Sequence, residues 1–465
     1  MGPLIMNIHL NRRAGSLAAR AFVLSLCIAA LPALAQQAVS AAEEPAISMA
    51  ELTRRLERLS AELANVKSEL AQVKSQQAAT RDAAPTAAGG WNGGGASTQA
   101  SGGAGAIEQP LPAAQEPATV LSSYGEINYN RPSKATEKSQ ADVRRLVIGL
   151  QHRVNDRTKV VGELEVEHAV TSGEGDPGEV AVEQAYVEHQ LTSSLAARGG
   201  LFLMPAGLLN ENHEPTAFYG VERNFVETAI IPTTWREAGV QLVANLDNGL
   251  TLQGGITTGF DLTKWDAASS EGAESPLGAI HQEAAQARAR NLTVFGAANW
   301  RGIPGLLVGG SVFTGDATHG QAGYPRSRVT LADVHARWTP GRWDLSALYA
   351  RGSISNTARL NQTLVGNPTL IPKSFDGWYA QAAYKLWSQG DYQLSPFVRY
   401  ENFNTARSYA YIGQGLTPAS ADTERVITVG ANFWLSPSVV VKADIQRFKV
   451  YSQSNRVNLG LGWSF

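Results

Sequence analysis

The sequence has almost no cysteine: its 465 residues include a single one, Cys27. That residue lies in a segment interpreted below as a secretory leader, so the expected mature chain has none. Disulfide bridges and thiolate metal sites are therefore excluded for the mature protein. Leu26 precedes the cysteine, whereas lipoprotein processing requires a small residue there.

Long apolar runs and a surplus of one charge are also absent. After residue 35, no apolar run approaches the roughly 20 residues of a membrane helix. The chain carries 39 basic and 41 acidic residues, a net charge of −2. Without Arg12, Arg13 and Arg20 the balance is 36 to 41, or −5. This balance does not suggest a nucleic-acid partner, and we expect no cofactor.

Residues 1–35 have the layout of a signal peptide. Arg12, Arg13 and Arg20 form a basic region, and an apolar run over residues 21–34 follows. Ala33-Leu34-Ala35 provides a small-x-small cleavage site. Because the run is short for a membrane span, we expect cleavage after Ala35 rather than a retained anchor.

Residues 46–77 are predicted to form an α-helical coiled coil in the periplasm. The apolar 3-4-3-4 spacing is unbroken, which favours a coiled coil over a lone helix packed on its own chain. The two heptad positions hold Met49, Leu56, Leu63 and Leu70, and Leu52, Leu59, Val66 and Val73. Glu62 and Glu69 precede Lys67 and Lys74 by five residues, the offset of interchain ion pairs in a parallel assembly. Leucine at position a favours a homotrimer.

Residues 78–119 are rich in Ala, Gly, Ser, Pro, Thr and Gln. Such a composition buries too little apolar surface to offset its ordering entropy. We predict a flexible linker.

Residues 120–465 consist of short alternating runs separated by Gly, Pro, Asn, Asp and Ser. The predicted strands start near Ser122, Val143, Lys159, Val180, Gly199, Glu237, Leu250, Asn291, Leu306, Val329, Trp343, Phe375, Tyr392, Arg425, Val439 and Arg456. An even number of strands with one apolar and one polar face predicts an all-β fold, a 16-stranded antiparallel transmembrane β-barrel with a wet lumen. The long polar stretches 261–288 and 352–373 are predicted to be extracellular loops.

The last nine residues are the strongest sign of a membrane barrel. Val457, Leu459, Leu461, Trp463 and Phe465 alternate with small or polar residues. A closing strand needs a lipid-facing apolar row, and we place Trp463 and Phe465 at the membrane interface. The alternative, a half-buried strand of a soluble sandwich, explains the aromatic ending less well.

Residues 205–237 do not fit a strand pattern and are too aromatic for disorder. A long loop of this kind in a compact structure is usually functional, and we predict that it folds into the lumen and narrows the pore. Its candidate constriction residues are Glu211, His213, Glu214, Arg223, Arg236 and Glu237. Each could instead only pin the loop to the wall. One histidine without converging partners does not make a metal ligand or a general base.

Strand parity also predicts which charged side chains face the lumen. The basic candidates are Arg145, Arg153, Lys159, Arg337, Lys385, Arg399 and Lys442. The same parity turns Glu163, Glu165, Glu167, Asp333, Glu401 and Asp444 inward. The predicted lumen is therefore of mixed sign.

The runs His213–Arg223 and Ile231–Gly239 and the ending Asn458–Phe465 resemble outer-membrane porins related to the phosphate-selective porin O/P family. The resemblance covers the barrel, about three quarters of the chain. It implies a homotrimer in the bacterial outer membrane, in which each barrel passes small hydrophilic solutes, with anions such as phosphate among the candidates. The leading coiled coil is similar to that of the DcaP-like dicarboxylate channels, which gives a second candidate solute class.

Hypotheses of two other classes remain. A barrel enzyme would need a convergent nucleophile and base, and the sequence offers no Ser-His constellation with credible placement, so we predict no catalytic residues. A barrel-anchored tether would use the coiled coil to reach peptidoglycan, which is compatible with a working pore. The other expected partners are outer-membrane lipid and the barrel assembly machinery, which would engage the C-terminal strand.

Overall fold

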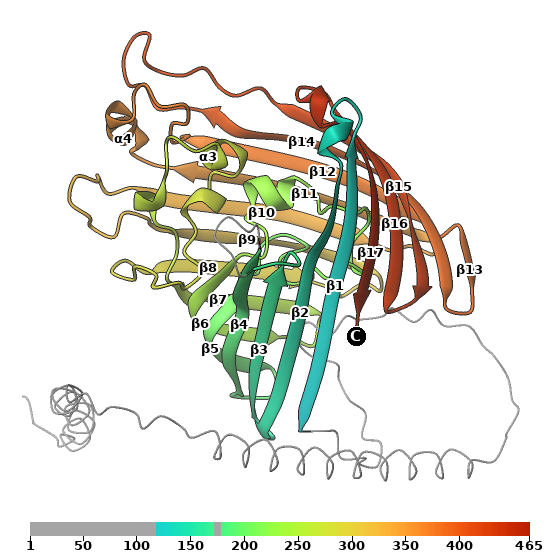
Figure 1. The fold of residues 1–465 in the computed structure, drawn as a ribbon. Coiled ribbons are helices and arrows are strands. Elements are labelled where there is room, and N and C mark those ends of the chain that lie inside the picture. The colour runs from blue at the N-terminus through green and yellow to red at the C-terminus, as the bar shows by residue number, and fades with distance from the viewer. Residues whose placement is uncertain (1–117, 172–177) are drawn as a thin grey trace, which may run out of the picture. The chain divides into compact units, whose positions relative to one another are not determined.

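The computed structural model describes residues 118–171 and 178–465 (Figure 1). The predicted leader, the predicted coiled coil and residues 78–117 of the predicted linker lie outside the described residues. Among the described helices, none combines the length and the apolarity that crossing a membrane demands.

The described chain forms one antiparallel sheet that closes on itself, because β1 pairs with β2 on one side and with β17 on the other. The strands are β1 (Thr119–Pro132), β2 (Gln140–Asn155), β3 (Thr158–Glu167), β4 (Glu179–Gln190), β5 (Leu195–Leu203), β6 (Arg236–Asn245), β7 (Leu250–Thr257), β8 (Thr293–Trp300), β9 (Leu306–Asp316), β10 (Arg328–Trp338), β11 (Trp343–Ile354), β12 (Ser374–Tyr384), β13 (Trp387–Gln389), β14 (Tyr392–Ser408), β15 (Glu424–Ser436), β16 (Val439–Phe448) and β17 (Arg456–Ser464). The short helical segments are η1 (Thr136–Lys138), η2 (Val226–Ile230), η3 (Leu262–Lys264), α3 (Glu271–Glu274), η4 (Gly278–Ile280), α4 (Thr357–Thr363) and η5 (Ser452–Ser454).

The barrel has sixteen strands, as predicted. The short strand β13 pairs only with β14, and β12 pairs with β14 just beyond it. The segments β12 and β13 are therefore two parts of one barrel strand, so the seventeen strand segments form sixteen barrel strands. The largest error in a predicted strand start is at β5, which begins at Leu195 rather than Gly199.

The two faces of each strand differ in the way a membrane barrel requires. In β10, Val334 is 61% exposed on the outer face, whereas Asp333 is 4% exposed on the inner face. Trp378 of β12 also faces outward, and its neighbour Tyr379 is buried inside. An exposed apolar face outside and polar groups inside is the reverse of a water-soluble protein, and it suits a lipid-facing wall.

The strand β17 closes the barrel through its last residue. Phe465 donates its N–H to Ser123 O at 2.9 Å and accepts from Ser123 N at 2.8 Å. Trp463 pairs with Gly125 and lies across it: a Cβ at residue 125 would come within 2.5 Å of the indole. A side chain at residue 125 would therefore force the indole to shift.

An apolar core occupies part of the barrel interior. The segment that links β5 to β6, residues 204–235, contributes Ile230 and Trp235 to it. The Trp235 ring stacks on Phe260 at a centroid distance of 5.1 Å and meets Phe313 of β9 edge-on at 4.7 Å. The two stretches predicted as polar extracellular loops also add buried residues to this core, namely Leu262, Leu277, Ile280, Leu360 and Ile371. These stretches fold back over the interior, because their apolar residues find partners there.

Candidate functional site

The segment 204–235, which we call the lumen loop, leaves β5 and returns at β6, but it is fastened to strands on the other side of the barrel. Phe218 O accepts from Asn432 Nδ2 of β15 at 3.0 Å, and Val221 N donates to Asp444 Oδ2 of β16 at 2.6 Å. Phe225 N donates to Glu401 Oε1 of β14 at 2.5 Å. The loop therefore crosses the lumen, and wall side chains satisfy backbone groups that have no strand partner.

A second anchor joins the first half of the lumen loop to β1 and β4. His213 Nε2 lies 2.6 Å from Tyr124 Oη, and Tyr124 donates to Glu183 Oε2 at 2.8 Å. Glu183 Oε1 lies 3.7 Å from the same imidazole nitrogen. Glu163 of β3 pairs with Gln184 and Leu164 pairs with Val182, so Glu183 is the unpaired extra residue of a β-bulge in β4. The bulge turns its side chain towards the lumen.

His213 is tuned by this anchor. Burial favours the neutral imidazole, but the neighbouring carboxylate of Glu183 outweighs burial and raises the pKa of His213 above its ordinary value of 6.5. The imidazole Nδ1 contacts Asn210 O at 2.9 Å. His213 thus fastens the lumen loop to the barrel wall. Among the described residues, no group of three His, Cys, Asp or Glu side chains is arranged to hold a metal ion.

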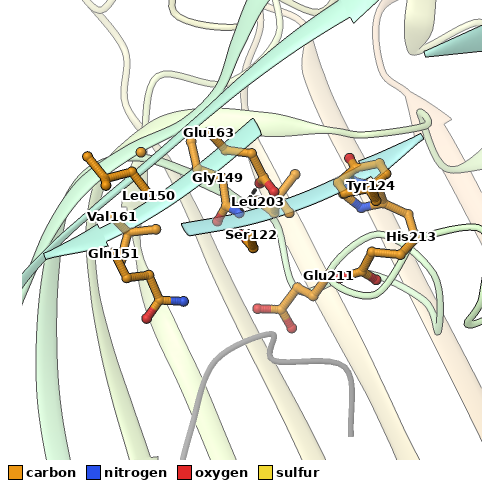
Figure 2. A pocket seen from close by; sticks show the side chains of 13 residues that line it. Ser122, Tyr124, Gly149, Leu150, Gln151, Val161, Glu163, Leu203, Glu211 and His213 are labelled. Carbon is orange, nitrogen blue, oxygen red and sulfur yellow. Dashed lines mark hydrogen bonds between the residues drawn. The ribbon is translucent and has the colours of Figure 1, made fainter. Parts of the chain in front are cut away.

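Beside His213 and Tyr124, a cavity opens between the inner wall of β1–β4 and the lumen loop (Figure 2). Glu163 approaches it from β3, and Glu211 and Glu214 approach it from the loop. Glu211 also accepts from Gln253 Nε2 at 3.2 Å, and burial raises its pKa. The cavity is lined mainly by acidic and neutral groups, so it offers little to an anion.

Two buried carboxylates brace the loop from within. Glu227 accepts from Leu208 N at 2.5 Å and Leu209 N at 2.8 Å. Burial raises the pKa of Glu227, and it outweighs these hydrogen bonds, which lower the pKa. Glu237, one of the predicted constriction residues, accepts from Trp235 Nε1 at 3.1 Å and Gly259 N at 2.8 Å, and also from Thr258. The structure gives Glu237 a bracing position with no exposed surface.

The two predicted loop arginines differ in their surroundings. Arg236 is paired, with its Nη2 3.0 Å from Glu283 Oε1. Arg223 donates to Thr233 Oγ1 at 2.6 Å and Thr234 Oγ1 at 2.9 Å, and no ion pair is seen for it among the described residues. Burial, with the nearby charge of Arg145, lowers the pKa of Arg223. Arg223 therefore carries its positive charge without a direct ion pair among the described residues, with the carboxylates of Glu126 and Glu183 nearby.

Four of the seven predicted lumen cations are neutralised by wall carboxylates. Their closest partners are Glu126 and Glu165 for Arg145, both at 2.9 Å, Glu188 for Lys159 at 3.0 Å, Asp344 for Arg337 at 2.7 Å, and Glu401 for Arg399 at 2.9 Å. Lys442 instead lies 3.5 Å above the centroid of the Phe218 ring. Arg153 is exposed near the end of β2, and Lys385 is exposed in the link between β12 and β13. The wall field is of mixed sign, and Lys442 and Arg223 are two of its cations for which no ion pair is seen among the described residues.

Parity in the sequence could have identified Tyr124, which alternates with Glu126 and Asn128 on the inner face of β1. No sequence signal identifies Glu183, because a bulge breaks the alternation that would predict its direction. Asn432 lies on the inner face of β15, but only the fold shows that it meets Phe218.

Known proteins resemble this chain in fold. No protein-family model matches it. A protein of Aquifex aeolicus (strain VF5) described as uncharacterized is 27% identical over 355 residues, which span 74% of this chain and 79% of that protein. The structure of Salmonella typhi OmpF in complex with daunomycin is 15% identical, with a TM-score of 0.51 over 75% of this chain and 97% of OmpF. The outer membrane channel DcaP of Acinetobacter baumannii is 12% identical, with a TM-score of 0.45 over 75% and 97%.

The chain has the barrel fold of outer-membrane porins. The similarity to OmpF supports this barrel fold and extends to the fold alone. Neither phosphate selectivity nor a dicarboxylate preference follows from it.

Proposed function

We propose that this protein is a channel of the bacterial outer membrane that lets small hydrophilic solutes diffuse down their gradients, with a weak preference for anions. The observation that carries the proposal is the closed sixteen-stranded wall, apolar outside and charged inside, with the lumen loop fastened across its interior. A path through lipid lined by charged groups of both signs selects by size and by the local field rather than by chemistry.

The anion preference rests on the unpaired cations. Arg223 and Lys442 lack carboxylate partners among the described residues, whereas most wall cations have them. The acidic groups around the cavity oppose this field, which is why we expect a weak preference. Phosphate and dicarboxylates both remain candidate solutes under the proposal.

The experiment is a planar-bilayer recording of the purified protein. We expect stepwise conductance and, in a salt gradient, a reversal potential of the sign that marks anion preference. Adding phosphate or succinate to the bath then compares the two solute classes by the reduction of chloride current. Insertion without any conductance would contradict the channel, and a cation-selective potential would contradict the preference.

The assembly is part of the same proposal. The heptads of residues 46–77 support three chains joined in the periplasm, each with its own barrel. The closing strand with its terminal Phe465 is the segment that we expect the barrel assembly machinery to recognise, and peptidoglycan is the expected contact of the coiled coil.

A further inference from the structure

The outer face of the barrel carries a cluster of basic side chains at one end of β15, β16 and β1. These strands follow one another around the wall in the order β15, β16, β17 and β1 (Figure 1). The cluster lies at the end of the barrel where long connections such as residues 409–423 join the strands. Its four exposed members, which we call the basic patch, are Arg131, Arg425, Arg447 and Lys449.

The direction of these side chains follows from the alternation of their strands. Ile427 of β15 and Ile445 of β16 are each 46% exposed on the outer face. Arg425 precedes Ile427 by two residues and Arg447 follows Ile445 by two residues, so both continue the outward rows of their strands. The basic patch therefore begins where the apolar outer surface of these strands ends.

The fold holds like charges of the basic patch side by side. Val426 pairs with Phe448, so the next residues, Arg425 and Lys449, stand opposite one another, and Lys449 N donates to Arg425 O at 3.0 Å. Arg447 pairs with residue 427, which makes it the diagonal neighbour of Arg425. Like charges opposite one another destabilise a strand pair. Their persistence here indicates that a group of opposite charge compensates them.

The buried carboxylate of Glu424 fixes this arrangement from the inner side. It is 2% exposed and accepts from the backbone N–H groups of Lys449 and Val450 at 2.9 Å each and of Tyr451 at 2.8 Å. Its oxygens are therefore occupied by the backbone after β16. Among the described residues, no ion pair is seen for any of the four side chains of the basic patch.

The opposite end of the same strands carries no charged side chain. Residues 118–125, 431–441 and 457–465 contain no Asp, Glu, Lys or Arg. Outward side chains at this end, such as Leu435 and Phe465, are apolar and exposed. This part of the wall is therefore matched to a membrane whose anionic groups are concentrated at the surface that meets the long connections.

We propose that the basic patch binds the phosphate groups of a lipid in the outer leaflet of the bacterial outer membrane. The inference rests on the membrane-spanning wall of the proposed channel, because only such a wall brings the patch to headgroup level. Long connections lie on the extracellular side of such barrels. The acyl chains lie against Ile427 and Ile445, and the phosphates reach Arg447 and the pair of Arg425 and Lys449. Guanidinium groups suit phosphate because they offer paired N–H donors.

The first test measures lipid binding to the detergent-solubilised full-length protein. The probe is diphosphoryl lipid A, and native mass spectrometry counts the lipid molecules that stay bound to each chain. The triple variant Arg425→Gln, Arg447→Gln and Lys449→Gln removes three charges from exposed positions. Each basic residue near an anionic lipid surface contributes about a factor of five in affinity, so we expect binding to weaken roughly a hundredfold.

Arg407→Gln is the matched control. Arg407 lies at the same end of the barrel, in β14, and its side chain is 41% exposed, but its Nε lies 3.0 Å from Asp376 Oδ1. Because this cation already has a carboxylate partner, we expect the control variant to bind the lipid like the parent. Equal losses in the control and the triple variant would overturn the inference, as would a triple variant that binds as tightly as the parent.

Two comparisons identify the group that is bound. Lipid A without its phosphates should bind to the parent at least about tenfold more weakly than the diphosphoryl form. Diphosphoryl lipid A should raise the melting temperature of the parent, and inorganic phosphate alone should not. Stabilisation by inorganic phosphate to the same extent would show a site for free anions. Binding that does not depend on the lipid phosphates would show an apolar contact only, and either result refutes the inference.

Channel recordings separate this inference from the proposed function. The basic patch lies outside the lumen, so the triple variant should conduct like the parent in a phosphatidylcholine bilayer, and altered conductance would contradict this placement. If the parent binds the lipid through the patch but conducts no ions, the lipid site holds and the channel fails. If the parent conducts and the triple variant binds the lipid unchanged, the channel holds and the lipid site fails.

Discussion

The bond between Asp444 and the lumen loop is the contact whose loss we expect to change the current most clearly. Asp444 is 3% exposed and accepts from Val221 N at 2.6 Å and Asn458 Nδ2 at 2.7 Å. Asp444→Ala leaves the buried Val221 N–H without an acceptor, which costs about 1–3 kcal/mol. A loss of about 2 kcal/mol raises the population of the detached loop roughly thirtyfold.

The assay is single-channel recording in a planar bilayer. A loop that detaches more often should produce current fluctuations in Asp444→Ala that the parent shows rarely, with a higher mean conductance. Asp444→Asn keeps a side-chain oxygen that can accept from Val221 and should stay close to the parent. Glu188→Ala changes the lumen charge equally on β4, where its ion pairs are with Lys159 and Arg198.

The comparison of these variants decides the matter. Currents of Asp444→Ala that match those of Glu188→Ala would mean that only charge was sensed. An Asn variant that fluctuates as strongly as the Ala variant would mean that the hydrogen bond does not hold the loop. Either result would refute the reasoning.

Three further predictions use the loop and the coil. Replacing Arg223 and Arg236 together by Ala should move the reversal potential towards cations, and Arg223→Ala alone should account for most of the change because Arg236 is paired; an unmoved potential would contradict this. Because the pKa of His213 is raised, its ion pair with Glu183 contributes stability in full below the ordinary value of 6.5, and this stability is lost as pH rises through the folded-state pKa. Loop fluctuations should therefore grow in alkaline buffer, and His213→Gln should remove that dependence, as noise analysis against pH can show. Deleting residues 46–77 should leave single-channel conductance intact and lower the melting temperature of the trimer; an unchanged melting curve would count against the coil.

The strand pattern could be predicted from the sequence because alternation is a local property. The inner and outer faces of β10 follow from the alternation of the sequence around Asp333 and Val334. The closing strand follows from the last nine residues of the chain. Every strand was found without knowledge of its neighbours, because a lipid-facing wall repeats the same period-two rule along each strand.

The interior could not be predicted in the same way. Parity turned Arg399 inward but could not show that Glu401 neutralises it, since that pairing depends on rotamers. The sequence places Glu237 among the constriction candidates but could not show that Trp235, Thr258 and Gly259 donate hydrogen bonds to it. Lumen contacts join residues that are far apart in sequence, and a local pattern carries no information about them.

The distance along the chain between the lumen loop and its fastenings has a consequence for biogenesis. Val221 and Asp444 are 223 positions apart in the chain, and Phe225 and Glu401 are 176 apart, so the loop cannot be seated until β14 and β16 have joined the wall. Contacts of such high sequence separation form late and slow the folding of β proteins. We therefore expect the barrel to pass through a stage with its wall partly built and its lumen segment still loose. In that stage the apolar residues around Trp235 are exposed and need protection from other chains. Folding is complete only when β14 and β16 have joined the wall and the lumen loop is seated on them.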